Sequence, residues 1–371
     1  MTSRLLGVIL LAGLTQVRTD WRVARPDYAW SFPQDHWSHP GYRAEWWYLT
    51  GHLTPDGATA PRYGYQFTFF RVGLLPRPTD SGSTWSAVDL VMGHAALTDV
   101  ATGRHVFSEV LYRATPLLGG FGAHPDSLIA WSRGPVGTAE RWTLRWNGRA
   151  FRVAMTDAAQ RIAFDLSTEP ARALVFQGPN GFSRKGAGPT AASQYYSFTR
   201  LRTSGTVTVG DSTARVSGES WMDKEFGSNQ LAASQVGWDW FSLQLDGGRE
   251  LMLYLLRDST GGVDYASGTL VPRSGAPRYL AREDFRVAVT RHWRSAASDA
   301  EYPAGWVLEV PQEGLRLVVE PLVADQENRS RLLPKLFYWE GAVRVRGADG
   351  RPAGRGYVEM TGYGRGARPA V

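Results

Sequence analysis

The 371-residue chain contains no cysteine, and this absence excludes several kinds of chemistry at once. Without a thiol there is no disulfide, no thiolate nucleophile, no cysteine-ligated zinc and no iron–sulfur cluster. Histidine is scarce as well, with seven residues, and only His36 and His39 have a spacing that resembles a pair of metal ligands. Nothing else completes a ligand set at a recognisable spacing, so the sequence predicts no metal site.

Lysine is the next residue that the chain nearly lacks. Only Lys185, Lys224 and Lys335 occur among the 41 basic residues, and the arginines are mixed with acids along the chain. Although the net charge is +6, no basic stripe forms, so we expect no nucleic-acid partner. The short motifs of serine hydrolases, zinc proteases and nucleotide-binding proteins are also missing, and these functions lose their usual support.

Long hydrophobic runs are absent apart from residues 5–14, which follow Arg4. Ten apolar residues are too few to span a bilayer but are enough for the core of a signal peptide. Residues 1–20 therefore predict an export signal or weak anchor, and with it a periplasmic or secreted protein without a further transmembrane segment. A buried N-terminal helix is the alternative interpretation.

From residue 40 onward the chain shows the pattern of β-strands. Short segments of alternating polarity end at Gly, Asp, Asn or Pro, and helical periodicity is scarce. The clearest hairpin joins residues 142–146 to 151–155 through Asn147-Gly148. Each half of the chain also contains an aromatic-rich strand, a turn with Asp-Gly and a strand that ends in arginine. We therefore predict an all-β protein with two related antiparallel barrels or sandwiches.

The segment 219–245 carries the residues that are most able to do chemistry. Alternate residues of a strand share a face, so Trp221, Asp223 and Glu225 should point the same way. Burial among aromatic rings would raise the pKa of a carboxyl group, and an acid that stays protonated near neutral pH can act as a general acid. The ring faces would stabilise a cation. This combination suits protonation of an electron-rich alkene followed by addition of water.

A structural interpretation of the same segment remains open. Asp223 or Glu225 could pair with Lys224 or an arginine and close the end of a barrel, while the tryptophans fill the core. Further along, Trp238 and Trp240 should share one face of a strand, with Asp239 on the opposite face.

A second aromatic cluster surrounds Glu45. Trp46 and Trp47 should lie on opposite faces of one strand, so that one is in the core and the other lines a cavity or a domain contact. Tyr48 follows them, and Tyr65 belongs to an alternating aromatic wall on the next strand. These rings favour either plain core packing or an apolar ligand cavity inside a barrel.

Three motifs together resemble the AttH/CrtC family, which includes bacterial carotenoid 1,2-hydratases and AttH-like proteins encoded beside ABC transporters. The resemblance extends over roughly residues 28–365. The motifs are Glu45-Trp46-Trp47-Tyr48, then Ser220-Trp221-Met222-Asp223-Lys224-Glu225-Phe226-Gly227, and finally Gly237-Trp238-Asp239-Trp240-Phe241 followed by Leu251-Met252-Leu253-Tyr254.

This resemblance implies two tandem lipocalin-like antiparallel β-barrel domains, residues 28–230 and 231–371, with an apolar ligand in a barrel or at the junction. The hydratases of the family are cofactor-independent and are thought to protonate a terminal isoprenoid double bond with an acidic residue. By motif match the acids are Asp223 and Glu225. Many relatives have histidine between these acids, where this chain has Lys224, and a histidine role in proton delivery is therefore in doubt.

Two functions follow from the residues and the resemblance. The first is an exported protein that binds a hydrophobic ligand, lipid or isoprenoid-like, in a β-barrel cavity, with ABC transporter components as partners. The second is a cofactor-independent hydratase or cyclase, a hydro-lyase of the carotenoid 1,2-hydratase type. The catalytic acids would be Asp223 and Glu225, and the predicted ligand-binding residues are Trp46, Trp47, Tyr48, Tyr65, Trp221, Trp238, Asp239 and Trp240.

Overall fold

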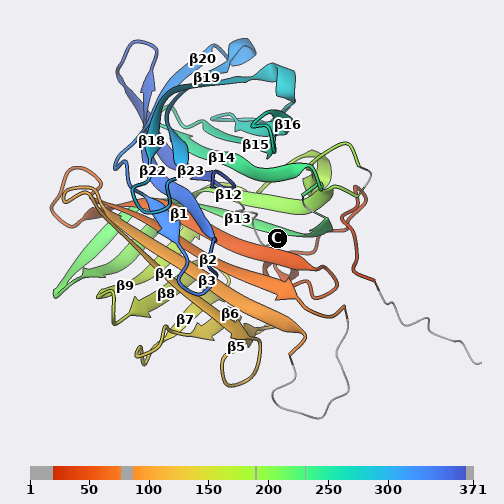
Figure 1. The fold of residues 1–371 in the computed structure, drawn as a ribbon, viewed down its shortest axis with the longest axis vertical. Helices are drawn as coiled ribbons and strands as arrows, with labels where there is room; N and C mark the ends of the chain where they lie inside the picture. Colours follow the sequence, from red (N-terminus) through yellow and green to blue (C-terminus); the bar gives the residue numbers. More distant parts are fainter. Residues whose placement is uncertain (1–19, 77–86, 189, 230, 365–371) are drawn as a thin grey trace, which may run out of the picture.

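The computed structural model describes residues 20–76, 87–188, 190–229 and 231–364, and nearly all of their regular structure is β (Figure 1). The strands form two antiparallel sheets, one a nearly closed barrel and the other a half-barrel, so the predicted all-β, lipocalin-like fold class is confirmed. The export signal predicted for residues 1–20 lies outside the described residues, except for Asp20. No helix among the residues described is long and apolar enough to cross a membrane.

The first sheet contains thirteen strands in the order β4-β3-β2-β1-β13-β12-β9-β8-β7-β6-β5, with β10 and β11 also paired to β12. It curls until β3 and β4 contact β5 and β6, which makes it the nearly closed barrel. Its strands are β1 (Ala44–Pro55), β2 (Tyr63–Gly73), β3 (Asp89–Asp99), β4 (Arg104–Arg113), β5 (Gly119–Phe121), β6 (Leu128–Arg133), β7 (Arg141–Trp146), β8 (Phe151–Asp157), β9 (Ile162–Pro170), β10 (Val175–Phe176), β11 (Phe182–Arg184), β12 (Ala192–Val209) and β13 (Ser212–Asn229).

The second sheet begins at Gln235, after the first has ended at Asn229, and its order is β17-β16-β15-β14-β23-β22-β20-β19-β18, with β21 paired to β22. Its strands are β14 (Gln235–Leu245), β15 (Glu250–Asp258), β16 (Val263–Val271), β17 (Arg278–Leu280), β18 (Arg286–Arg294), β19 (Glu301–Val310), β20 (Leu315–Pro321), β21 (Glu327–Arg329), β22 (Phe337–Gly347) and β23 (Pro352–Met360). Four short 3₁₀ helices complete the regular structure: Gln34–His36, Pro179–Gly181, Arg282–Asp284 and Pro311–Glu313.

The predicted hairpin around Asn147-Gly148 is present as β7 and β8, and the backbone N–H of Asn147 donates to the carbonyl oxygen of Ala150 at 3.2 Å across the turn. Strand pairing stops at Trp146 and Phe151, and the side-chain oxygen of Asn147 accepts hydrogen bonds from the backbone N–H groups of Arg149 and Ala150. Gly148 adopts a φ of +91°, a conformation that glycine takes at little cost. The local sequence therefore predicted the pairing correctly, while the asparagine side chain sets the shape of the turn.

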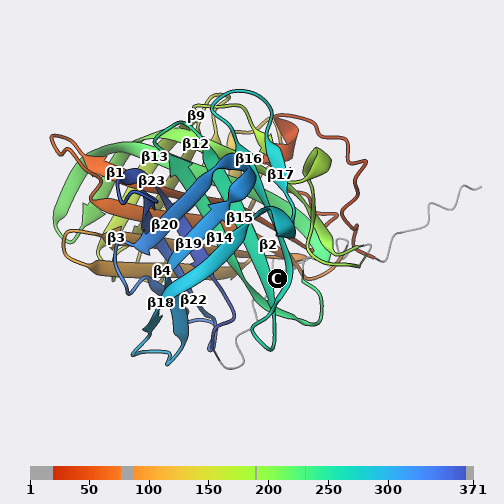
Figure 2. The same cartoon turned by 90° about the horizontal axis from the view of Figure 1, so that it is seen from above.

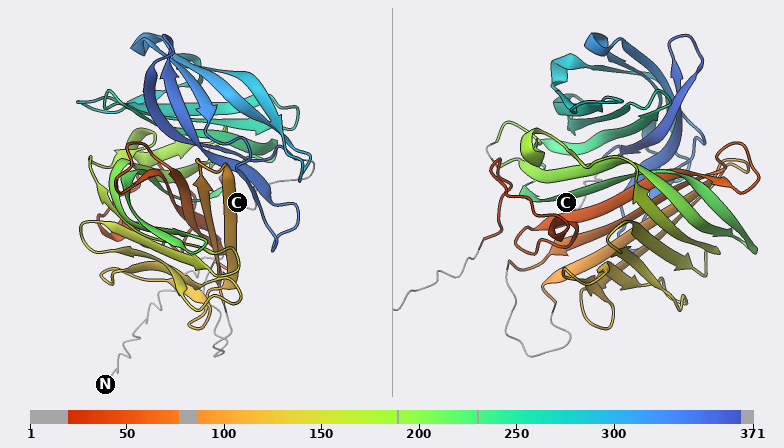
Figure 3. Two further views of the ribbon diagram at one scale, coloured as in Figure 1. Left: turned by 90° about the vertical axis from the view of Figure 1, so that its left-hand side faces the viewer. Right: turned by 180° about the vertical axis from the view of Figure 1, so that it is seen from behind.

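The two sheets are stacked, with the half-barrel lying across the outer face of β1, β2, β12 and β13 (Figures 2 and 3). Strand β23 packs against β1, β22 against β2, and β14 against β12. Polar contacts hold this junction in place: Gln244 of β14 donates hydrogen bonds to the carbonyl oxygens of Thr199 and Ser220, at 2.8 and 2.9 Å. Buried Glu250 of β15 accepts from Arg200 of β12 at 2.8 Å.

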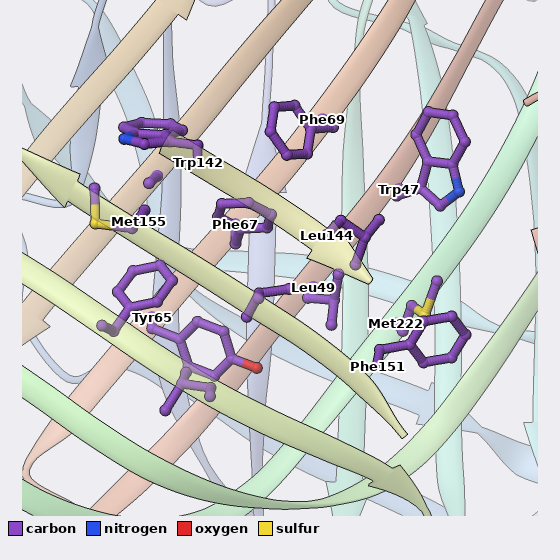
Figure 4. Close-up of a cluster of buried hydrophobic side chains, with 14 of the residues drawn as sticks. Trp47, Leu49, Tyr65, Phe67, Phe69, Trp142, Leu144, Phe151, Met155 and Met222 are labelled. Atoms are coloured by element: carbon purple, nitrogen blue, oxygen red, sulfur yellow. The ribbon is translucent and has the colours of Figure 1, made fainter. Parts of the chain in front are cut away.

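Hydrophobic side chains fill the inside of each barrel. In the first barrel, Trp47, Phe67, Trp142 and Phe151 are completely buried and pack against aliphatic residues from most of its strands (Figure 4). A second core, centred on Trp306, fills the half-barrel. A third cluster lies between the sheets and contains mainly aromatic residues from β1, β12, β13, β14, β15 and β23. This third cluster surrounds the candidate site.

Candidate active site

A cavity of about 90 Å³ lies at the junction, between the outer faces of the two sheets. The ligand space inferred from sequence was a cavity inside a barrel, or the junction of the two; the packed interiors favour the junction. Eight of the seventeen side chains that line the cavity are aromatic, and four carboxyl groups and one ammonium group lie among them. They are Trp46, Tyr48, Gln66, Thr68, Phe70, Lys185, Tyr195, Asp223, Glu225, Leu231, Trp238, Trp240, Tyr254, Leu256, Tyr338, Glu340 and Glu359.

Strand register places the lining residues of the first sheet in rows. Tyr48 of β1 lies opposite Asp223 of β13, and Asp223 lies opposite Ser197 of β12. Two residues further along β13, Glu225 lies opposite Trp46 of β1. Because side chains alternate along a strand, both acids face the junction, as the sequence indicated for this stretch. The shared orientation of the two carboxyl groups therefore follows directly from the pleat of β13, and the stacked second sheet covers them.

Asp223 is buried and accepts three hydrogen bonds. Its carboxyl oxygens receive the hydroxyl of Tyr195 at 2.6 Å, the hydroxyl of Ser197 at 2.5 Å and the indole N–H of Trp221 at 2.7 Å. Burial raises the pKa of Asp223 to about 7, even though these three donors favour the charged form and lower it. Asp223 therefore carries a proton in a substantial fraction of molecules at neutral pH, in contact with an aromatic cavity.

Glu225 has a different environment two residues further along the same strand. Its carboxylate pairs with the ammonium group of Lys185 at 2.8 Å and accepts a hydrogen bond from Ser193 at 2.5 Å. The same ammonium group lies 4.4 Å from the ring centre of Tyr254 and 5.1 Å from that of Tyr195. Glu225 is thus held as the partner of a cation, whereas Asp223 has only uncharged donors.

The second sheet contributes two carboxyl groups that the sequence analysis missed. Glu340 of β22 and Glu359 of β23 are paired residues in the register of the sheet, and Glu359 in turn lies opposite Trp240 of β14. The indole N–H of Trp238 donates to Glu359 at 3.2 Å. Each acid stands alone between hydrophobic residues of its strand, and this interruption of an apolar pattern was the only signal in the sequence. Without the strand pairing, nothing connected Glu340 and Glu359 to each other or to Asp223.

The remaining predicted ligand-binding residues fall into two groups. Trp46, Tyr48, Trp238 and Trp240 line the cavity, and Trp221 lies behind the wall and binds Asp223. The other three lie elsewhere, each on the opposite face of its strand.

Trp47, Tyr65 and Asp239 are the three that do not line the cavity. Trp47 and Tyr65 are in the core of the first barrel, where the Tyr65 hydroxyl is 2.7 Å from that of Ser220. Asp239 pairs with Arg257 at 3.0 Å and accepts hydrogen bonds from Tyr363 at 2.9 Å. Sequence analysis identified the aromatic strands, but for Trp46 and Trp47 it did not establish which face would meet the second sheet.

Lys224 lies on the barrel side of β13, away from the cavity. Its ammonium group binds Glu45 at 2.5 Å and is 3.5 Å from the ring centre of Trp47. Glu45 is shared with Arg71 at 2.5 Å and with His39 at 3.1 Å. Burial lowers the pKa of Lys224 to about 8, against the carboxylate of Glu45, which raises it. The Lys224 side chain therefore stabilises the end of the barrel and does not line the cavity.

A metal ion has no evident place in the part of the chain that is described, where no group of three or more His, Asp or Glu residues could hold one. The site contains one acid with a pKa of about 7, Asp223, together with several aromatic rings and three further carboxyl groups. These are the components of proton-transfer chemistry on an apolar ligand.

Comparison with known proteins agrees with this architecture. The crystal structure of a putative AttH from Nitrosomonas europaea superposes with a TM-score of 0.81 at 32% identity, covering 93% of this chain and 100% of that one. Kievitone hydratase from Nectria haematococca gives a TM-score of 0.63 at 14% identity, covering 88% and 91%. CghA in its structure with Sch210972 gives 0.51 at 13%, covering 87% and 89%. The last two likenesses are in fold alone.

No curated protein matches the sequence at a significant level. The family model described as AttH-like, however, matches residues 23–363, almost the whole described chain. The resemblance noted from the three sequence motifs is thereby confirmed, and the chain belongs to the AttH-like family.

Proposed function

We propose that this protein binds an apolar alkene in the junction cavity and adds water to it without a cofactor, with Asp223 as the general acid. The observation that carries the proposal is the environment of Asp223, whose carboxyl group is buried among aromatic rings with a pKa of about 7. A pKa close to the working pH lets one group both hold and release its proton. Among the described residues no arginine or lysine pairs with Asp223, so no fixed cation holds it in the charged form.

The chemistry proceeds in two bond-forming steps. Asp223 transfers its proton to one carbon of the double bond, which forms a C–H bond and leaves a positive charge on the neighbouring carbon. The faces of Trp240, Tyr48 and Trp46 stabilise this cation, because aromatic rings carry negative charge density on their faces. The oxygen of a water molecule then attacks the cation, and loss of one proton from that oxygen gives the alcohol.

The substrate class follows from the lining of the cavity. A wall of tryptophan, tyrosine, phenylalanine and leucine favours a hydrocarbon segment, and a double bond that yields a tertiary cation is the easiest to protonate. An isoprenoid chain has both properties. The name of kievitone hydratase, a protein of the same fold, supports water addition as a reaction that this architecture can host.

Binding without chemistry is the second candidate, and it was the first expectation from the sequence. The aromatic and aliphatic part of the lining favours it, because that part alone is enough to hold a hydrophobic ligand. A function in binding alone gives no role to the protonated Asp223 in the same cavity. Export from the cytoplasm and a link to ABC transporter components stay predictions from the sequence.

The deciding experiment compares the wild-type protein with Asp223→Asn on a linear isoprenoid such as geraniol. We expect the wild type to form the hydrated product and Asp223→Asn to lose about 100-fold or more of that rate, the usual contribution of a general acid. Quenching of tryptophan fluorescence by the isoprenoid should persist in the variant. Asp157→Asn is the matched control, since Asp157 is a buried acid that accepts a hydroxyl hydrogen bond from Ser108 away from the cavity.

Two outcomes would contradict the proposal. Full turnover by Asp223→Asn would remove the assigned acid. Tight binding of the isoprenoid by the wild type with no product and no exchange of solvent deuterium into the alkene would favour the binding function.

A further inference from the structure

Glu340 and Glu359 lie in the wall of the cavity that faces the first sheet. They are directly paired residues of β22 and β23, and side chains at such positions have Cβ atoms about 5 Å apart. Strand β22 packs against β2 and β23 against β1, so this pair faces Gln66 and Tyr48 across the cavity. The proposed acid Asp223 lies beside Tyr48 in the register of the first sheet.

Three buried side chains meet in this part of the cavity: Tyr48, Gln66 and Glu340, the last only 1% exposed. The Tyr48 hydroxyl interacts with the carboxyl group of Glu340, and this lowers the pKa of that acid against the larger effect of burial. Oε1 of Gln66 has no hydrogen-bond partner among the described residues. Buried polar atoms without a partner are rare, and a water molecule, with two hydrogens to donate and a lone pair to accept, can join such an acceptor to a neighbouring carboxyl group.

The protonation of Glu340 and Glu359 is suited to a general base. Two buried carboxyl groups that are directly paired across a sheet cannot both ionise at low cost, so one keeps its proton while the other can be a free carboxylate. Burial and then the charge of Glu359 raise the pKa of Glu340 well above its usual value, and burial raises that of Glu359 to about 7. A negative charge on Asp223 is one of the causes of the raised pKa of Glu359. The proton affinity of the pair therefore increases when Asp223 has given up its own proton.

We propose that Glu340 and Glu359 together form the general base of the hydration, and that Tyr48 and Gln66 position the attacking water. This inference rests on the proposed function. As the water oxygen bonds to the cationic carbon, one O–H bond of the water breaks and its proton passes to the ionised carboxylate of the pair. The pair then releases a proton to solvent, and Asp223 takes one up. Alkene and water are consumed and one alcohol is formed.

The experiment separates the two proton transfers by running the reaction on geraniol in D₂O with wild type, Glu340→Gln and Glu340→Gln/Glu359→Gln. Protonation by Asp223 and its reversal put deuterium into recovered alkene, and water addition gives alcohol. We expect the variants to lose about 100-fold of alcohol formation while deuterium exchange into the alkene stays within a few-fold of wild type. Glu327→Gln is the control, because Glu327 is a buried acid of the same sheet, bound by Ser295 and Tyr302 away from the cavity.

Each outcome decides something. Equal alcohol formation by wild type and the double variant overturns the assignment of the base, as does parallel loss of exchange and hydration. A wild type that neither exchanges nor hydrates refutes the proposed function, and the inference falls with it. A second readout checks folding and the shared proton together: the infrared band of protonated carboxyl groups at pH 7 should weaken in Glu340→Gln/Glu359→Gln and stay unchanged in Glu327→Gln.

Discussion

The indole N–H of Trp240 in the second sheet donates a hydrogen bond of 3.2 Å to the hydroxyl of Tyr195 in the first. That hydroxyl in turn donates to Asp223 at 2.6 Å. The proposed acid is therefore connected to both barrels, and its protonation depends on how they are packed together. Four predictions follow from this arrangement and from the buried charges around it.

The rate of hydration should depend on pH through Asp223. This acid acts in its protonated form, and its pKa is about 7 because burial disfavours the charge. Above that pH the protonated fraction falls tenfold per unit, so kcat/KM should fall equally steeply between pH 7.5 and 9. A rate that stays constant to pH 9 would show that Asp223 is not the proton donor. Steady-state kinetics across pH 5 to 9 provide the measurement.

Tyr195→Phe should move this pH dependence upward. The tyrosine hydroxyl stabilises the ionised carboxylate, so its removal raises the pKa of Asp223. A hydrogen bond to a charged group contributes about 1.5–3 kcal/mol, which corresponds to roughly 1–2 pH units. The alkaline limb of the kcat/KM profile reports this shift. Tyr196→Phe is the control, because the Tyr196 hydroxyl contacts His36 inside the barrel, and its profile should match wild type.

Lys224→Met should weaken folding and leave the cavity intact. Removing one partner of a buried ion pair usually costs about 3–5 kcal/mol, and we expect the lower end because Arg71 still compensates Glu45. Urea unfolding measures the loss, and isoprenoid binding should be unchanged in the folded variant. Lys335→Met, at an exposed position, should change stability by less than about 0.5 kcal/mol. Loss of binding in folded Lys224→Met would place Lys224 in the site.

Stability should fall as the pH rises from about 4.5 toward 7, in part because of Glu340 and Glu359. Their pKa values are raised in the folded protein, so the folded state binds more protons than the unfolded state in this range. The stabilisation is complete below the unfolded pKa and is lost as the pH passes the folded one. Calorimetric melting at several pH values should give a flatter slope for Glu340→Gln/Glu359→Gln. An identical slope in variant and wild type would contradict the shared proton.

Local sequence was sufficient for the β character of the chain, for the β7–β8 hairpin and for the faces of β13. Strict alternation placed Asp223 and Glu225 on one face and Lys224 on the other, since a pleated strand permits no other arrangement. The same alternation separated Trp46 from Trp47 and Trp240 from Asp239. Which face of each pair would meet a cavity was not decided locally, because both faces of these strands are buried.

The amino-acid sequence by itself determined an all-β chain, its family and an acid flanked by aromatic residues, because these depend on residue type and on a period of two. Only the tertiary structure decided where the ligand space lies. Stacking of one barrel on the other brought β22 and β23 against β2 and β1, and so placed Glu340 and Glu359 in the same cavity as Asp223. Those contacts join residues more than 100 positions apart, and no local pattern encodes the packing of one sheet face on another.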